Sequence, residues 1–425
     1  MVDQIEIQPR GPLFATIRPP GSKSITNRAL ICAALAEGNS RLAGVLDSDD
    51  TRVMIDALRR LGVPLHFSPA AELVELRGCG GHWPAKYANL FIGNSGTSIR
   101  FLTAALAAGE GLYRLDGIER MRQRPIGDLL ETLRQLGACA YSEANNSCPP
   151  VVLRAAGLRG GTAAVRGDIS SQFLSGLLMA LPYARRDVNL RVIGTLVSQP
   201  YVAMTLRVMK SFGVEAYTAG LTQFHFPAGQ RYRGCRYEIE PDASAASYFW
   251  GAAAITGGEI TVTGLHRQAL QGDVAFCDCL ARMGCEVTYR DNNITVAGRA
   301  KHGITVDMNA ISDTVQTLGA VALFAEGATT ITGVAHIRHK ETDRIGDLAR
   351  ELRKLGATVE EFEDGLRIIP GPASGAVIET YNDHRMAMSL ALAGLRIPGV
   401  VINDPGCTAK TYPRFFADFE RLPER

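Results

Sequence analysis

A lysine and an arginine stand close together near the start of the sequence, among small and hydroxyl residues. Residues 21–24 read Gly-Ser-Lys-Ser, Arg28 follows, and Ala, Leu, Ile and Cys residues then indicate a helix. The N–H groups that begin a helix attract anions, and Lys23, Ser24 and Arg28 add charge and hydroxyl donors. A capped surface helix can carry the same residues, so both interpretations stay open at this point.

Two further segments of the first half could face an anion. Residues 93–97, Gly-Asn-Ser-Gly-Thr, follow an apolar strand, and Gly96 lets a ligand approach the backbone closely. Arg124 ends a run with three arginines in five positions, which Pro125 follows, and guanidinium groups hold phosphate or carboxylate through paired hydrogen bonds. An ordinary strand-to-helix turn and a solvated basic turn are the alternatives.

A cluster of neutral donors marks the start of another helix. Ser170, Ser171 and Gln172 precede an apolar run, and Ser198 and Tyr201 stand at the next strand-to-helix joint. One serine is explained by helix capping, but the triplet is not. These side chains are suited to a second anion.

The second half of the sequence carries the candidate acids. Five charged residues of both signs occupy seven positions at 338–344, just before an amphipathic stretch. Carboxylates beside Lys and Arg are how proton-transfer groups are held in an anion site, although solvated helix faces look similar. The candidate residues of this half are Asp313, His336, Lys340, Glu341, Arg344, Arg385 and Lys410.

Taken together, these segments predict a cleft lined by cations from both halves of the chain. Only seven residues are Lys, and three of them (Lys23, Lys340 and Lys410) fall where we expect helices to start. A cationic cleft indicates a strongly anionic ligand set, either doubly phosphorylated or carrying phosphate and carboxylate. The motifs typical of zinc peptidases, Rossmann dinucleotide binding and serine hydrolases are absent from the sequence, so we expect no metal and no cofactor.

Composition narrows the class of protein. With 425 residues, 46% of them hydrophobic, and a net charge of +2, the chain is long enough for two cores and lacks a nucleic-acid-binding charge excess. Nine Cys in so long a chain indicate free thiols in a reducing compartment. Without a recognisable leader or a membrane-length apolar run, we expect a cytoplasmic protein that binds neither membrane nor nucleic acid.

An amphipathic segment ending in Gly recurs along the chain. The glycines are Gly62, Gly137, Gly213, Gly284 and Gly356, spaced 75, 76, 71 and 72 residues apart. Each is followed by a strand-like stretch, so the pattern predicts an α/β protein of about six units of roughly 70 residues. Proline sites at 19–20 and 241 divide these units into a first domain, 21–240, and a second domain, 1–20 plus 241–425.

The motifs, in this order, are similar to those of the 5-enolpyruvylshikimate-3-phosphate (EPSP) synthase family, and the resemblance covers nearly the whole chain. They are residues 21–24 with Asn27-Arg28, residues 93–97, 124–127, 170–172 and 340–344. The resemblance implies two similar lobes, each of three βαβαββ repeats, joined by two crossovers. It also implies transfer of the enolpyruvyl group of phosphoenolpyruvate to the 5-hydroxyl of shikimate 3-phosphate, with release of phosphate through a non-covalent tetrahedral intermediate.

The resemblance assigns roles residue by residue. For shikimate 3-phosphate it implies Lys23, Ser24, Arg28, Ser170, Ser171, Gln172, Ser198, Tyr201, Asp313, His336 and Lys340. For phosphoenolpyruvate it implies Lys23, Gly96, Arg124, Gln172, Arg344, Arg385 and Lys410. Asp313 resembles the base at the 5-hydroxyl, and Glu341, with Lys23 nearby, resembles the group that handles the methylene proton. Many members carry Asn where this chain has His336.

Two alternatives remain. The sister enzymes that enolpyruvylate UDP-N-acetylglucosamine resemble this fold, but they have a Lys-Asn pair and a loop Cys. Here Ser24 follows Lys23, and residues 112–124 contain no Cys. A non-catalytic anion-binding protein of the same fold would not need Asp313 and Glu341. We therefore expect a monomeric transferase of the shikimate pathway, acting in aromatic amino acid biosynthesis on small-molecule substrates.

Overall fold

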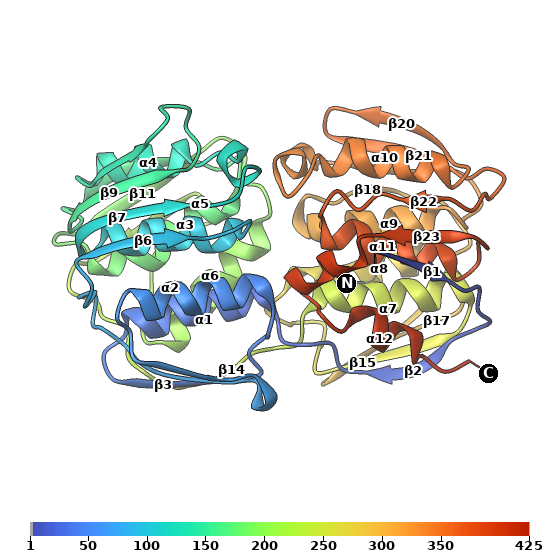
Figure 1. Ribbon diagram of the computed structural model, residues 1–425, viewed down its shortest axis with the longest axis horizontal. Helices are drawn as coiled ribbons and strands as arrows, with labels where there is room; N and C mark the ends of the chain where they lie inside the picture. The colour runs from blue at the N-terminus through green and yellow to red at the C-terminus, as the bar shows by residue number, and fades with distance from the viewer. Residues whose placement is uncertain (1–2, 425) are drawn as a thin grey trace. The chain divides into compact units, whose positions relative to one another are not determined.

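The computed structural model describes residues 3–424, and the chain divides into two compact units (Figure 1). Unit 1 contains the chain up to Pro20 and residues Glu240–Arg425, and unit 2 contains Gly21–Ile239. The chain therefore passes from one unit to the other twice. The sequence pattern predicts these passages at 20/21 and 240/241, and in the structure the second lies one residue earlier, at 239/240.

Unit 2 begins with helix α1 and ends with strand β14. Its helices are α1 (Lys23–Leu35), α2 (Asp49–Arg60), α3 (Gly96–Ala107), α4 (Gly127–Gln135), α5 (Ser171–Ala180) and α6 (Gln199–Ser211), with 3-10 helices η1 (Pro69–Ala71), η2 (Met121–Gln123) and η3 (Leu181–Tyr183). Its strands are β3 (Asn39–Ala43), β4 (Leu65–Ser68), β5 (Leu73–Arg77), β6 (Tyr87–Phe91), β7 (Glu110–Asp116), β8 (Cys139–Ser142), β9 (Val151–Ala156), β10 (Gly161–Arg166), β11 (Val188–Ile193), β12 (Tyr217–Ala219), β13 (Gln223–Phe226) and β14 (Arg236–Glu238).

Unit 1 repeats this composition. Its helices are α7 (Ala243–Thr256), α8 (Phe276–Arg282), α9 (Val315–Ala322), α10 (Arg344–Lys354), α11 (His384–Gly394) and α12 (Phe415–Glu420), with η4 (Gly272–Ala275), η5 (Asn309–Thr314), η6 (Ala335–His339) and η7 (Pro405–Lys410). Its strands are β1 (Gln4–Ile7), β2 (Phe14–Ile17), β15 (Glu259–Thr263), β16 (Glu286–Arg290), β17 (Asn293–Ala297), β18 (Thr305–Asp307), β19 (Thr329–Thr332), β20 (Thr358–Phe362), β21 (Gly365–Ile369), β22 (Val377–Ile378) and β23 (Val400–Asn403).

One strand pattern recurs in the sheets. In each of five four-stranded sheets, an edge strand pairs in parallel with the next strand, which joins a hairpin whose pairings are antiparallel. The described part of the chain holds three sheets in each unit, and the sixth sheet is shorter, with order β1-β23-β22. There the N-terminal strand β1 replaces the hairpin. The predicted repeat is therefore present six times.

Each repeat contributes one helix that is buried almost all round and one that covers the core with a single face. All residues of α7 are buried, whereas α10 buries Ile345, Leu348 and Leu352, which recur at helical spacing. Gly356 follows α10 with φ +98°, a conformation that glycine adopts without a steric penalty. The strands alternate buried and exposed residues, as in β11. The sheets thus have one face toward the helices and one toward solvent.

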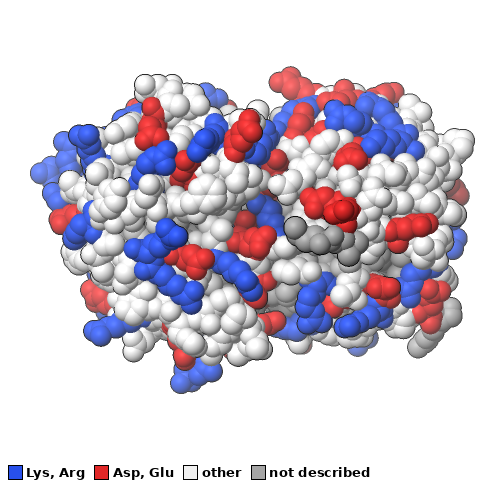
Figure 2. Space-filling view, in the orientation of Figure 1, with Lys and Arg blue, Asp and Glu red and all other residues white. Residues whose placement is uncertain are grey.

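The surface carries both signs of charge. On the face drawn in Figure 2, Lys and Arg are interspersed with Asp and Glu over each unit. Among residues 3–424, no helix combines the length and the apolar character that crossing a bilayer requires. The nine cysteines are free thiols, and burial raises the pKa of Cys279 and of Cys285 to about 11.

Candidate active site

In unit 2, the first predicted cation lies at the start of a buried helix. Ser22 caps α1 by accepting a hydrogen bond from the Ile25 N–H at 3.4 Å, so Lys23 and Ser24 occupy the first turn. The N–H groups of a first turn have no partner within the helix and favour anions. The Lys23 ammonium lies 3.5 Å from the Asp50 carboxylate at the start of α2, and both side chains are almost fully buried.

Arg28 ties three helices of unit 2 together. Its guanidinium donates to the Thr205 hydroxyl at 2.7 Å, the Ser175 hydroxyl at 3.2 Å and the Tyr201 carbonyl at 3.2 Å. It also lies over the rings of Phe101 and Tyr201, at 5.1 and 5.9 Å from their centroids. Burial lowers the pKa of Arg28 to about 10. Most of this cation's donors are therefore used inside the unit, and its local role is to hold α1 against α5 and α6.

The starts of α3 and α5 are joined through side chains. Arg100 Nη1 donates to Gln172 Oε1 at 2.7 Å, and Gln172 Nε2 donates to the Thr97 hydroxyl at 3.2 Å. Ser170 caps α5 by accepting from the Gln172 N–H at 3.2 Å, which leaves Ser171 in the first turn. Ser198, with φ +52°, occupies the position just before the first turn of α6. The predicted neutral donors thus stand at helix N-termini.

The three arginines at 120–124 have different environments. Only Arg124 is buried, and its Nη1 donates to the Asn94 carbonyl at 3.1 Å and to Asn94 Oδ1 at 3.2 Å. A Cβ added to Gly96 would lie 2.4 Å from Arg124 Nη2, so the glycine allows the guanidinium to reach the start of α3. Arg122 instead pairs with Asp116. The three arginines therefore do not share one environment, and Arg124 is the one that lies beside Gly96.

In unit 1, Asp313 accepts from three cations. Its carboxylate lies 2.6 Å from Lys340 Nζ, 3.3 Å from Arg344 Nη1 and 2.8 Å from Arg385 Nη2. Asp313 comes from η5, whereas the cations come from the segment before α10 and from the first turns of α10 and α11. Residues separated by up to 72 positions are therefore brought to one carboxylate.

Glu341 has a similar environment. Its carboxylate lies 2.9 Å from Arg344 Nη2 and 3.8 Å from Lys410 Nζ. Arg344 is also bound by Asp383, through contacts of 2.7 and 3.1 Å. Burial lowers the pKa of Arg344, but the charges of Asp383 and Glu341 outweigh it and hold the pKa above its usual value. The cluster thus contains seven charged groups, in which three acids alternate with four cations: Asp313, Glu341, Asp383, Lys340, Arg344, Arg385 and Lys410.

Two of the predicted lysines do not begin α-helices. Lys340 directly follows η6, and Lys410 ends η7, so the expectation that they lie at helix starts is wrong. Burial lowers the pKa of Lys340. His336 lies in η6 and is 6% exposed. Burial, and then the charge of Lys340, lowers the pKa of His336 to about 3, so this ring is neutral at pH 7.

Sequence reasoning missed several partners of the site. Asp383, Asp50 and Arg100 each contact a predicted residue, but the sequence analysis assigned none of them a role. A signal existed for Arg100, because a cation stands among apolar residues of a helix that is buried on all sides. Asp383 lies just before α11, where an N-cap accounts for it, and it does accept from the Arg385 N–H at 2.9 Å.

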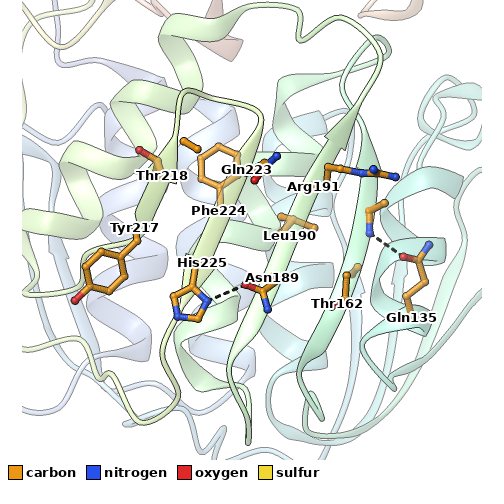
Figure 3. Close-up of a pocket in the computed structure, with 13 residues that line it drawn as sticks. Gln135, Thr162, Asn189, Leu190, Arg191, Tyr217, Thr218, Gln223, Phe224 and His225 are labelled. Atoms are coloured by element: carbon orange, nitrogen blue, oxygen red, sulfur yellow. Dashed lines mark hydrogen bonds between the residues drawn. The ribbon is translucent and has the colours of Figure 1, made fainter.

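Other parts of the structure do not compete with these clusters. The described residues contain no group of three or more His, Cys, Asp or Glu side chains arranged to hold a metal ion. A hollow of about 730 Å³ lies on the exposed face of the sheet β10-β11-β13-β12. Figure 3 shows that Tyr217, His225, Asn189 and Arg191 line it, with His225 Nδ1 2.9 Å from Asn189 Oδ1. None of the predicted site residues lies there.

Comparison with known proteins identifies the class. Residues 7–419 match the family model described as EPSP synthase (3-phosphoshikimate 1-carboxyvinyltransferase). The 3-phosphoshikimate 1-carboxyvinyltransferase of Nostoc punctiforme is 49% identical over 426 residues, with both chains fully covered, and that of Shewanella oneidensis is 46% identical over 99% of both chains. The solved EPSP synthase of Acinetobacter baumannii superposes with a TM-score of 0.83 at 28% identity, covering 99% of this chain and 98% of that one.

The chain belongs to the EPSP synthase family. It is thus a transferase of the shikimate pathway of aromatic amino acid biosynthesis, as the order of its motifs predicted. The predicted α/β fold of two similar lobes is confirmed as well. The roles of individual residues are not part of this identification and rest on the contacts described above.

Proposed function

We propose that this protein joins phosphoenolpyruvate to the 5-hydroxyl of shikimate 3-phosphate and releases phosphate, with the residues of the two units in the roles that follow. The observation that carries this proposal is a pair of carboxylates, Asp313 and Glu341, that are each held by cations. An anion-binding protein needs the cations alone. Two carboxylates among them supply a base and an acid, which the transfer of an enolpyruvyl group requires.

Unit 2 supplies the residues that bind shikimate 3-phosphate, in this proposal. Ser24, Ser170, Ser171, Gln172 and Ser198 offer hydroxyl, amide and N–H donors at the starts of α1, α5 and α6. Lys23 adds charge to this set, while Arg28 and Tyr201 hold the helices that present it. Gly96 and Arg124 take phosphoenolpyruvate, because the guanidinium lies against the start of α3.

Unit 1 supplies the acids and a second set of cations. Lys340 and His336 contact shikimate 3-phosphate, and Arg344, Arg385 and Lys410 bind phosphoenolpyruvate. In the structure these cations contact the carboxylates of the cluster. The phosphate and carboxylate of the substrate offer the same kind of partner, so substrate binding releases Asp313 and Glu341 from part of their ion pairs. The released carboxylates are then able to exchange protons.

The reaction proceeds by addition and elimination. Glu341, with Lys23 close by in the reaction, delivers a proton to the methylene carbon of phosphoenolpyruvate, which makes C2 electrophilic. The oxygen of the 5-hydroxyl bonds to C2 while Asp313 takes the hydroxyl proton. This addition forms the tetrahedral intermediate. The C2–O bond to phosphate then breaks, the methyl group returns a proton, and the arginines and Lys410 stabilise the departing phosphate. No covalent intermediate on the protein is needed.

The test measures phosphate release from phosphoenolpyruvate with two acceptors in parallel. We expect turnover with shikimate 3-phosphate and none with UDP-N-acetylglucosamine; the reverse result refutes the proposal in favour of the sister reaction. Asp313→Asn and Glu341→Gln should lower kcat by about 100-fold or more while both substrates still bind. Glu360→Gln, an exposed carboxylate of unit 1, is the matched control. Binding without any turnover in the unaltered protein would point to an anion-binding role.

We further propose that the protein works as a cytoplasmic monomer on small molecules alone. Its two units carry all the residues assigned above, so no second copy is required for the chemistry. Light scattering combined with size-exclusion chromatography, with both substrates present, tests the monomer. A dimer would refute this part of the proposal and leave the residue assignments to the kinetic experiment.

A further inference from the structure

A buried carboxylate outside the clusters described above lies at the end of β7. Asp116 is 6% exposed, and both of its oxygens accept two hydrogen bonds. Oδ1 accepts from the Gly117 N–H at 2.7 Å and from Arg122 Nε at 3.0 Å, and Oδ2 accepts from Arg122 Nη2 at 2.8 Å and Arg114 Nη1 at 3.2 Å. The Arg122 contact is thus a two-point pair that fixes both distance and orientation.

The same pair spans the turn that ends at Arg124. Residues 117–123 leave β7, form η2, and lead to the Arg124 N–H, which donates to the Met121 carbonyl at 3.1 Å. Met121 is fully buried, and the Ile118 N–H donates to the Gly93 carbonyl at 3.1 Å. One side of the turn is therefore held by packing against the 93–97 segment. Its other side is held by Arg122 through Asp116.

We propose that Asp116 is a positioning residue for the phosphoenolpyruvate site: its pair with Arg122 fixes the turn that presents Arg124. This inference rests on the proposed function of Arg124. The guanidinium of Arg124 contacts Asn94 and lies against Gly96. A shift of the turn by about 1 Å therefore moves this guanidinium away from the start of α3.

Asp116 also balances the charge of the turn. The turn carries Arg120, Arg122 and Arg124 within five positions, and the carboxylate of Asp116 is buried beside the middle one. Burial alone would raise the pKa of Asp116, but hydrogen bonds from Arg122 and Gly117 hold it below its usual value. Asp116 is therefore ionised at neutral pH and offsets the mutual repulsion of the arginines.

Glu143, the other acid near these arginines, does not hold the turn. Glu143 pairs with Arg114 at 2.7 to 3.1 Å, and both side chains are partly exposed. Its ion pair is with Arg114 of β7, so it supports the sheet rather than the turn. Asp116 is the acid that bonds both the strand arginine and the turn arginine.

The test is a double-mutant cycle of Asp116→Ala and Arg122→Met in the full chain, with kinetics for each substrate. Each single variant should raise KM for phosphoenolpyruvate about tenfold, with kcat and KM for shikimate 3-phosphate within about twofold. The double variant should have the same KM for phosphoenolpyruvate as each single variant, because both substitutions remove the same Asp116–Arg122 interaction. Glu131→Gln, which breaks an exposed pair with Arg134 on α4 of the same unit, should leave all three constants unchanged.

A crystal structure of the Arg122→Met variant provides a readout that does not depend on activity. We expect the 117–124 turn to shift and Arg124 to lose its contacts with Asn94. The variant should still fold, because Asp116 keeps the hydrogen bonds from Arg114 and the Gly117 N–H. Unchanged contacts, or an unchanged KM for phosphoenolpyruvate, refute the positioning role. Equal changes in both KM values with a large fall in thermal stability also refute it. Absence of turnover in the unaltered protein refutes the proposed function instead, and the crystal structure then decides the role of Asp116 separately.

Discussion

Arg344 and Asp383 form a two-point ion pair inside unit 1, with Nε–Oδ2 at 2.7 Å and Nη2–Oδ1 at 3.1 Å. Arg344 begins α10 and Asp383 caps α11, so the pair joins the starts of two helices. The two side chains are 2% and 0% exposed. A buried pair of this kind is costly to break, because the remaining charge has no water to replace its partner.

Replacing Asp383 should therefore destabilise unit 1 and displace Arg344. For Asp383→Ala we expect a loss of about 3–5 kcal/mol, which corresponds to a fall of roughly 6–20 °C in the thermal midpoint. KM for phosphoenolpyruvate should also rise, since Arg344 is assigned to that substrate. Asp291→Ala, at an exposed turn of the same unit, is the control for calorimetry and kinetics. A midpoint within 2 °C of the unaltered protein would contradict the importance of the pair.

Lys23 lies in the first turn of α1, and helix N–H groups and an ammonium at such a position favour binding of an anion. Lys23→Met should reduce kcat/KM by about 1,000-fold or more while the chain stays folded, because Met retains the buried aliphatic stem. Lys210→Met, on the exposed side of α6, should leave turnover unchanged. Steady-state kinetics with circular dichroism checks both variants. Near-normal turnover would remove Lys23 from the site.

The two arginines beside Gly96 leave no room for a side chain at this position. A Cβ at this position would lie 2.4 Å from Arg124 Nη2 and 2.8 Å from Arg100 Nη1, which is closer than atoms pack. Gly96→Ala should therefore push the Arg124 guanidinium outward and raise KM for phosphoenolpyruvate by about tenfold, with a small effect on stability. Gly11→Ala, whose new Cβ would make an ordinary 3.4 Å contact, serves as the control. Equal KM values in the two variants would show that Arg124 does not bind this substrate.

The repeat was predictable because its signals are local. An amphipathic run needs only a glycine in the left-handed region to end it, and Gly356 with φ +98° is such a residue. The sixth repeat was less predictable, because β1 comes from the far end of the sequence to complete its sheet. A strand of four residues that pairs with residues 400–403 leaves no mark in the local pattern.

The positions of candidate residues at helix starts could be predicted from the sequence, whereas the contacts among these side chains could not. Lys23 and Ser170 can be recognised from residue type and from their place before an apolar run. That Arg122 faces Asp116 while Arg124 faces Asn94 depends on the path of one turn. The pairing of Arg344 with Asp383 depends on two helices that begin 40 residues apart. Such contacts are set by tertiary packing, so sequence reasoning treated the three arginines as one group.

His336 makes stability depend on pH. Its pKa is lowered by burial from 6.5 to about 3. Between these two pH values the ring binds a proton in the unfolded chain and stays neutral in the folded chain. The stability that goes with the neutral ring is present above pH 6.5 and is lost progressively as pH falls toward 3. At pH 5 this loss amounts to about 2 kcal/mol. Asn is polar and smaller than His and does not titrate, so His336→Asn should reduce the fall in thermal midpoint between pH 7.5 and pH 5. His302→Asn, at an exposed position of the same unit, should leave that fall unchanged. If both variants lose stability with pH as the unaltered protein does, the ring of His336 is not buried in its neutral form.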